Sequence, residues 1–242
     1  DVHESLTSRS FVDAMERIGS EVGRLEALFD ELDIRGVSAD AAPVVDSETG
    51  RRLDSAIREF NRVVADSEIL EAYVYSTVST NSRDELGQSR LSELEVIGSR
   101  LGPLLARLAD FTGDHGVDQL VGVSTEAREH HGPLQRLAAR SEHQMSEELE
   151  GLYAELGTTG SSAWGRLQAD MTSQLSVEVS LPDGTRRMPM PMVRGLATDA
   201  DPGVRRAGYD AEMEAWPQVA TACAAAMNAI KGEANTVNRR RS

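Results

Sequence analysis

The sequence is poor in cysteine, aromatic residues and long apolar runs, and each of these shortages excludes a class of protein. A single cysteine, Cys223, excludes an internal disulfide and therefore a small disulfide-stapled secreted scaffold. Aromatic residues make up 4% of the 242 residues, and clusters of β-branched or aromatic residues are few, so a large sheet is not expected. No apolar run reaches the length of a membrane span and no signal-peptide pattern is visible. We therefore expect a cytoplasmic location and no membrane partner.

Positive charge is also scarce. Lysine and arginine total 25 against 40 aspartates and glutamates, which gives a formal net charge of -15. Such a surface repels a phosphate backbone unless basic residues are segregated into a patch. The one basic cluster is Arg239, Arg240 and Arg241, with Lys231 shortly before it. We therefore expect no nucleic-acid partner.

Apolar residues recur with heptad spacing in the first segment. They step by 4-3-4-3-4-3, which places them on one face of a helix, as in a coiled coil. The positions are Phe11, Met15, Ile18, Val22, Leu25, Phe29 and Leu32. This seam, residues 11–32, has two interpretations: it packs inside the chain, or it serves a partner helix.

Two further long helices follow. Apolar periodicity predicts one over 48–79 and another ending near residue 112, with Ser82 and Glu85 as a capping box at its start. Pro103 should kink or split the latter helix. The predicted fold class is mainly α, an antiparallel helical bundle with coiled-coil-like long helices. The predicted domains are a long-helix bundle over 1–112 and a helical region with a β-hairpin over 113–242.

The second region carries one β signal. Apolar and polar residues alternate over 175–181, Pro182-Asp183-Gly184 follows, and a second extended run ends near 190, which predicts a β-hairpin at about 175–190. Three alternating methionines could line an adaptable groove or pack the hairpin onto the helices. They are Met188, Met190 and Met192.

Short helices are expected over 124–131, 133–140, 146–156 and 161–175. Asp201 and Pro202 start a further helix as N-cap and first residue. The last helix, 219–237, is rich in alanine, so a neighbour can pack closely. We predict an exposed apolar strip there, or its coverage by another copy. The strip consists of Ala222, Ala226, Met227 and Ile230.

Chemistry-bearing motifs are missing. The sequence has no HExxH, no P-loop, no G-x-S-x-G and no dinucleotide fingerprint, so no catalytic or metal-binding residue is assigned and substrate-binding residues are unknown. A metal site is a weaker alternative. Glu126 lies four residues before His130 and could share its helix face, and His131 directly follows His130. The third ligand of such a site would come from Asp114, His115, Glu142 or His143. The plainer interpretation is a solvated helix surface.

Several motifs of the second half resemble the oligoendopeptidase F family of zinc metallopeptidases, in the order that the family shows. Residues 145–167 read MSEELEGLYAELGTTGSSAWGRL, 201–209 read DPGVRRAGY, 228–233 read NAIKGE, and 238–241 read NRRR. The heptad-rich first half fits the family's N-terminal helical region in layout. The resemblance therefore covers essentially the whole chain.

The resemblance implies a role in peptide hydrolysis, which the residues alone do not indicate. In that family HExxH and the other catalytic residues lie in the C-terminal half, beyond these 242 residues. The chain would be the N-terminal, cleft-forming scaffold of a zinc oligoendopeptidase that hydrolyses short peptides. It would hold no cofactor and be inactive alone, with zinc expected in the complete enzyme. Its partners would be the C-terminal catalytic half or another copy. The alternative is a stand-alone, non-catalytic helical interaction module.

Overall fold

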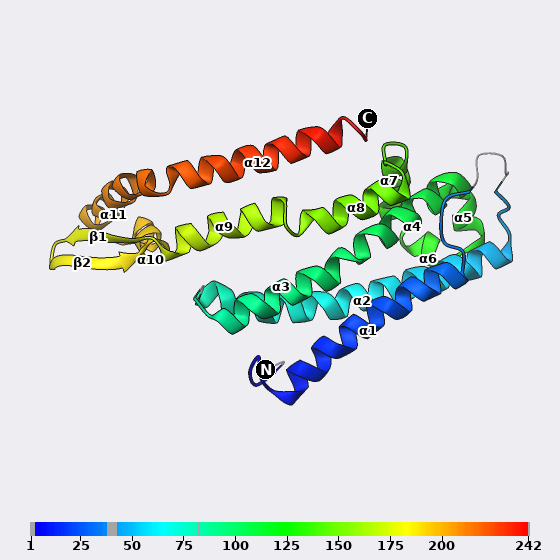
Figure 1. Cartoon of the computed structure of the whole chain (residues 1–242), viewed down its shortest axis with the longest axis horizontal. Helices are drawn as coiled ribbons and strands as arrows, with labels where there is room; N and C mark the ends of the chain where they lie inside the picture. Colours follow the sequence, from blue (N-terminus) through cyan, green and yellow to red (C-terminus); the bar gives the residue numbers. More distant parts are fainter. Residues whose placement is uncertain (1–2, 38–42, 82, 242) are drawn as a thin grey trace. The chain divides into compact units, whose positions relative to one another are not determined.

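The computed structural model describes residues 3–37, 43–81 and 83–241 (Figure 1). The chain forms two compact units. Unit 1 comprises Asp1–Thr158 and Asn238–Ser242, and unit 2 comprises Thr159–Val237. The predicted division after residue 112 differs from this one, because the helix that begins at Leu101 packs against two helices later in the chain.

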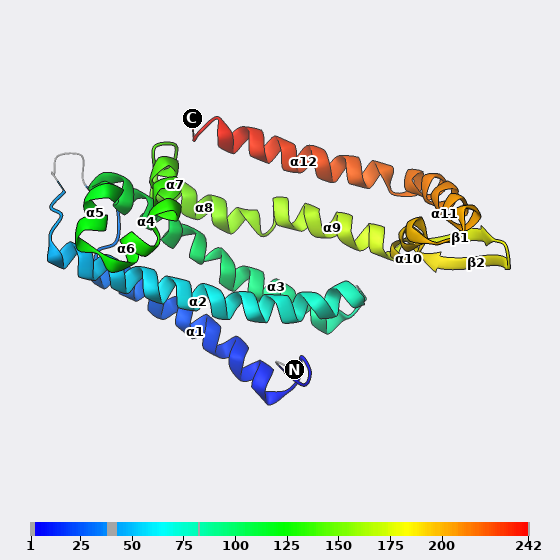
Figure 2. The same cartoon turned by 180° about the vertical axis from the view of Figure 1, so that it is seen from behind.

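Unit 1 contains eight helices within the described residues. They are α1 (Arg9–Glu31), α2 (Ser47–Thr80), α3 (Glu85–Ser99), α4 (Leu101–His115), α5 (Val117–Val123), α6 (Thr125–Glu129), α7 (His131–Ser141) and α8 (Glu147–Gly157). The first three lie side by side in Figures 1 and 2 and contact one another. The Arg52 guanidinium near the start of α2 donates to the carbonyls of Leu32 and Asp33 at the end of α1, as expected for antiparallel neighbours. This confirms the antiparallel bundle of long helices.

The heptad seam is internal. Phe11, Val22 and Leu25 on α1 are fully buried, and they share one core with residues of α2, α3 and α4. Leu32, just beyond the helix, is partly buried against the same core. The seam is therefore not available to a partner helix.

Helix boundaries follow the local chemistry, with one correction. The N-cap of α3 is Asp84, whose carboxylate accepts the Gly87 N–H at 2.8 Å, and not Ser82, which lies outside the described residues. Asp84 takes this position because its own N–H donates to the Asn81 carbonyl in the turn before the helix. The predicted split near Pro103 is confirmed. This residue lies in the first turn of α4, where its missing N–H breaks no helical hydrogen bond.

Unit 2 is built around the predicted hairpin. Its elements are α9 (Ser161–Gln174), β1 (Ser176–Leu181), β2 (Gly184–Pro189), α10 (Met190–Gly195), α11 (Pro202–Ala215) and α12 (Ala220–Asn238), with 3-10 turns at Leu196–Thr198 and Trp216–Gln218. The strands are antiparallel and Leu181 pairs with Gly184, which leaves Pro182 and Asp183 as the turn. Val177 and Val179 are buried in a core with residues of α10 and α11.

The methionine and alanine predictions hold only in part. Met188 and Met190 are buried in the hairpin core, which confirms packing for these two, whereas Met192 is 61% exposed. On α12 the predicted apolar strip is discontinuous, because Met227 is 63% exposed while Ala226 is buried. No helix in the described ranges combines the length and apolar character that crossing a bilayer requires.

The glycine at position 50 allows the start of α2 to pack closely against the end of α5. A Cβ on Gly50 would lie 2.1 Å from the Val123 carbonyl oxygen, which is backbone and cannot move aside. We expect Gly50→Ala to lower the free energy of unfolding by about 3 kcal/mol. Gly98→Ala on α3 is the control, because open space surrounds that position and the change raises helix propensity. Urea unfolding followed by circular dichroism measures both, and equal midpoints would contradict the assigned contact.

The buried seam predicts the effect of a charge on α1. Val22→Asp places an unpaired carboxylate in the core, at a cost comparable to the whole stability of a domain. We expect the variant to lose its cooperative thermal transition, while Ser20→Asp, at an exposed position of the same helix, keeps it. Sedimentation velocity tests the other interpretation: a folded Val22→Asp monomer derived from a wild-type dimer would show that the seam serves a partner.

Candidate functional site

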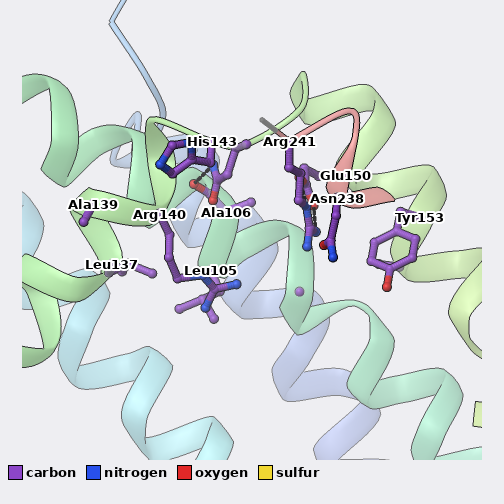
Figure 3. A pocket seen from close by; sticks show the side chains of 13 residues that line it. Leu105, Ala106, Leu137, Ala139, Arg140, His143, Glu150, Tyr153, Asn238 and Arg241 are labelled. Atoms are coloured by element: carbon purple, nitrogen blue, oxygen red, sulfur yellow. Dashed lines mark hydrogen bonds and ion pairs between the residues drawn. The ribbon is translucent and has the colours of Figure 1, made fainter. Parts of the chain in front are cut away.

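Unit 1 has a cavity of about 730 Å³ that is open to solvent (Figure 3). Its apolar wall comes from α4, α7 and α8. The apolar lining side chains are Leu105, Ala106, Leu137, Ala139 and Ala154. Its polar lining comes from α7, the loop after it, α8 and the last described residues. The polar lining side chains are Arg140, His143, Gln144, Glu150, Tyr153, Asn238 and Arg241. The site therefore gathers segments that are far apart in the sequence.

Small residues and one amide position these walls. A Cβ on Gly102 would lie 3.6 Å from the Ala154 methyl group, so the small side chains allow α4 and α8 to pack closely. The Gln144 side-chain amide donates to the Ala106 carbonyl at 3.3 Å and to Asp110 at 2.8 Å. These two bonds attach the loop after α7 to α4 and fix the rim of the cavity.

An ion pair forms another part of the wall. The Arg241 guanidinium donates two hydrogen bonds to the Glu150 carboxylate, with Nε 2.9 Å from Oε1. The same guanidinium lies over the Tyr153 ring, 5.1 Å from its centroid. Glu150 also accepts the Met145 N–H at 3.1 Å. This bidentate, partly desolvated arrangement is the strong form of an arginine–carboxylate contact.

The ion pair between Arg241 and Glu150 shifts the pKa of both side chains. Burial raises the pKa of Glu150, but the hydrogen bonds from Arg241 and the Met145 N–H outweigh burial, so the pKa is lowered overall. The hydrogen bond to Glu150 raises the pKa of the Arg241 guanidinium. Both groups are therefore charged at neutral pH. Arg241, predicted as part of a basic cluster, is neutralised by its partner.

A second hollow beside the first is acidic. Its lining includes Asp110, Asp114, Asp118 and Glu142. Burial raises the pKa of Asp110 to about 6, with a smaller contribution from the charge of Asp114, while the Gln144 hydrogen bond opposes the rise. Asp114 accepts the Val37 N–H at 2.6 Å and so attaches the segment after α1 to α4. Asp110 and Asp114 thus have local structural partners.

The alternative metal site does not assemble. His130 lies 3.5 Å from Glu126, whereas His131 lies 3.1 Å from Asp118 on another helix. The chain breaks between α6 and α7 at His130, so the two imidazoles turn toward different neighbours.

The other proposed ligands are also separate. His115 is buried with Nδ1 2.8 Å from the Phe111 carbonyl oxygen, and His143 lines the cavity. Within the ranges that the structure describes, no three His, Cys, Asp or Glu side chains are grouped to hold a metal. The described residues therefore fit neither this alternative nor the zinc that the family resemblance implies.

The cavity itself was not predicted from the sequence. Its residues come from positions 102–106, 137–144, 150–154 and 238–241, and no local spacing links these segments. A pattern search finds ligands on one helix face or one loop, whereas this site depends on which helices pack together. The one available signal was the arginine run at 239–241, which was interpreted as charge and as a family motif but not as part of a binding site.

The fold and the sequence match the same group of proteins. A family model described as Oligopeptidase F matches residues 114–176. The crystal structure of oligoendopeptidase-F from Enterococcus faecium is similar to 97% of this chain with a TM-score of 0.71 at 15% identity. A search of curated proteins found no match. These findings confirm the resemblance to the oligoendopeptidase F family and the mainly α fold with one hairpin. The chain spans 44% of the length of that solved structure.

The raised pKa of Asp110 predicts a pH-dependent stability. Because the folded-state pKa of about 6 exceeds the ordinary aspartate pKa of 3.8, the charged carboxylate destabilises the fold at neutral pH. Asp110→Asn removes the charge and keeps an oxygen that can accept from Gln144. We expect a gain of about 1 kcal/mol at pH 7, discounted because the group is partly solvated.

The gain should disappear as the pH falls from about 6 to below the unfolded pKa, since Asp110 is then protonated in both states. Thermal unfolding of both proteins between pH 3 and pH 8 measures it. Asp118→Asn is the control, because that carboxylate lines the same hollow but is 87% exposed. A gain at pH 7 that persists unchanged at pH 4 would contradict the burial of charge.

Proposed function

We propose that this chain is the N-terminal, cleft-forming scaffold portion of a zinc-dependent oligoendopeptidase that hydrolyses short peptides. One observation carries the proposal: 97% of the chain is similar to 44% of a solved oligoendopeptidase-F. The family match over residues 114–176 supports it independently, because it rests on sequence and not on shape.

The proposal divides the work of hydrolysis between two parts of the enzyme. The described residues offer no zinc ligand set, so the metal and the reacting groups would come from the C-terminal half. This chain would supply a rigid helical wall, held by the buried seam of α1. A cleft walled by long helices admits short, unfolded peptides and excludes folded proteins. The enzyme would act in the cytoplasm, where Cys223 stays reduced.

The alternative is a stand-alone helical interaction module. Its main support was a seam on α1 offered to a partner helix. That seam is buried in unit 1, with Phe11 and Val22 fully inaccessible. The module would therefore need another surface, and the scaffold is the better-supported function.

The proposal predicts that the 242-residue chain and a longer chain differ in zinc content and in peptidase activity. After dialysis against a chelator, the 242-residue chain should retain much less than one equivalent of zinc and cleave no fluorescence-quenched peptide. A longer chain that includes the segment encoded downstream should contain HExxH, retain zinc and cleave the peptide. Metal analysis and a fluorescence assay measure both.

The control tests the residues of this chain. Glu126→Gln and His130→Gln in the longer chain should leave zinc content and cleavage unchanged, because neither side chain belongs to a ligand group in the described structure. Stoichiometric zinc in the 242-residue chain, with cleavage abolished by Glu126→Gln, would contradict the proposal. So would a downstream segment without HExxH.

A further inference from the structure

The cavity of unit 1 contains polar side chains that are free to bind a ligand. The side chains of Arg140, His143, Tyr153 and Asn238 donate no hydrogen bond within the described chain, although all four line the same cavity. By contrast, Arg241 and Gln144 are held by protein partners. The cavity therefore combines polar groups that are hydrogen-bonded to the protein with four whose donors make no hydrogen bond in the described chain, although the Tyr153 ring contacts Arg241 and the Arg140 charge acts on Glu150.

The charge of the lining has the opposite sign to that of the protein. Two arginines, Arg140 and Arg241, face one glutamate, Glu150, so the lining carries one net positive charge even with His143 neutral. The whole chain carries a formal charge of -15. One unit of positive charge matches a monoanion, and the Glu150 carboxylate in the wall disfavours a dianion.

The size and polarity of the cavity restrict further which class of ligand it can bind. Its volume of about 730 Å³ lies within the range of small-molecule sites. Leu105, Leu137 and the methyl groups of three alanines provide an apolar surface for an aliphatic group. The planar guanidinium of Arg140 suits a carboxylate, which it can bind through two parallel hydrogen bonds.

From these features we propose that the cavity between α4, α7 and α8 binds a small monocarboxylate with an apolar body, of the size of an acylated amino acid. Arg140 would bind the carboxylate, Tyr153 and Asn238 would donate to its polar groups, and the leucines would contact its aliphatic part. The inference uses only residues of unit 1 and does not rest on the proposed peptidase function.

Matched ligands test the proposal. N-acetyl-leucine carries the carboxylate and the apolar body, whereas N-acetyl-leucinamide has the same shape without the charge. We expect saturable binding of one equivalent of the acid by calorimetry. Its affinity should exceed that of the amide by about tenfold or more, the effect of one charge-assisted hydrogen bond. Acetate and inorganic phosphate should bind more weakly than the acid, because neither uses the apolar wall.

Matched variants locate the site. Arg140→Gln should weaken binding of N-acetyl-leucine by about tenfold, and Ala139→Leu should block the cavity. Arg136→Gln is the control, because it removes the same charge from an exposed position of α7 outside the cavity. Circular dichroism establishes that each variant folds, and all three altered side chains of α7 are exposed.

Three results would overturn the proposal. Equal affinities for the acid and the amide would remove the role of the carboxylate. Equal losses in Arg140→Gln and Arg136→Gln would indicate general attraction to positive charge. Acetate or phosphate binding as tightly as N-acetyl-leucine would show an anion site without the apolar specificity assigned here.

Discussion

Burial of the apolar face of α1 is the constraint on which unit 1 depends. The chain has four phenylalanines, and three of them, Phe11, Phe29 and Phe111, are almost fully inaccessible in this core. A sequence poor in aromatic residues thus places most of its phenylalanine at the contacts of α1 with α2 and α4. Dense packing of this kind tolerates little change in volume or charge. The positions of α2, α3 and α4, which contact α1, depend on it.

The end of α1 is stabilised by arginines from its neighbours. Arg52 of α2 donates to the Leu32 and Asp33 carbonyls, and Arg107 of α4 donates to the Ile34 carbonyl at 2.8 Å. These carbonyls belong to residues 32–34, which directly follow the last helical residue Glu31, and positive charge is favourable close to that end of a helix. Both guanidinium groups also lie 5.7 Å from the centroid of a buried phenylalanine ring. Polar capping and apolar burial therefore meet at one place.

Strongly periodic parts of the fold could be predicted from the sequence. These parts are the seam of α1, the long α2, the split near Pro103 and the hairpin at 175–190. Each depends on a pattern within one helix or one hairpin. The helix α5 was not predicted, because Gly116 with φ 74° separates it from α4 and leaves only a short apolar pattern. The limits of the compact units and the cavity depend on contacts of α4 with α7 and α8, which no local pattern contains.

The predictions about functional residues also succeeded or failed according to whether they depended on a local pattern. Spacing along one helix suggested His130 as a metal ligand, but the chain breaks at that residue. The family resemblance was more informative, since its motifs occur in order over the whole second half. What neither approach could provide is the pairing of Arg241 with Glu150, because the two residues lie on segments that meet only in the folded chain.

That pairing has a consequence for how the protein is made. Glu150 leaves the ribosome 91 residues before Arg241 does, with all of unit 2 between them. At a synthesis rate of 5–20 residues per second, Glu150 waits roughly 5–20 s for its partner. During that interval the carboxylate lacks the two hydrogen bonds from Arg241. Unit 1 therefore completes its folding after translation of unit 2, although most of its residues are synthesised first.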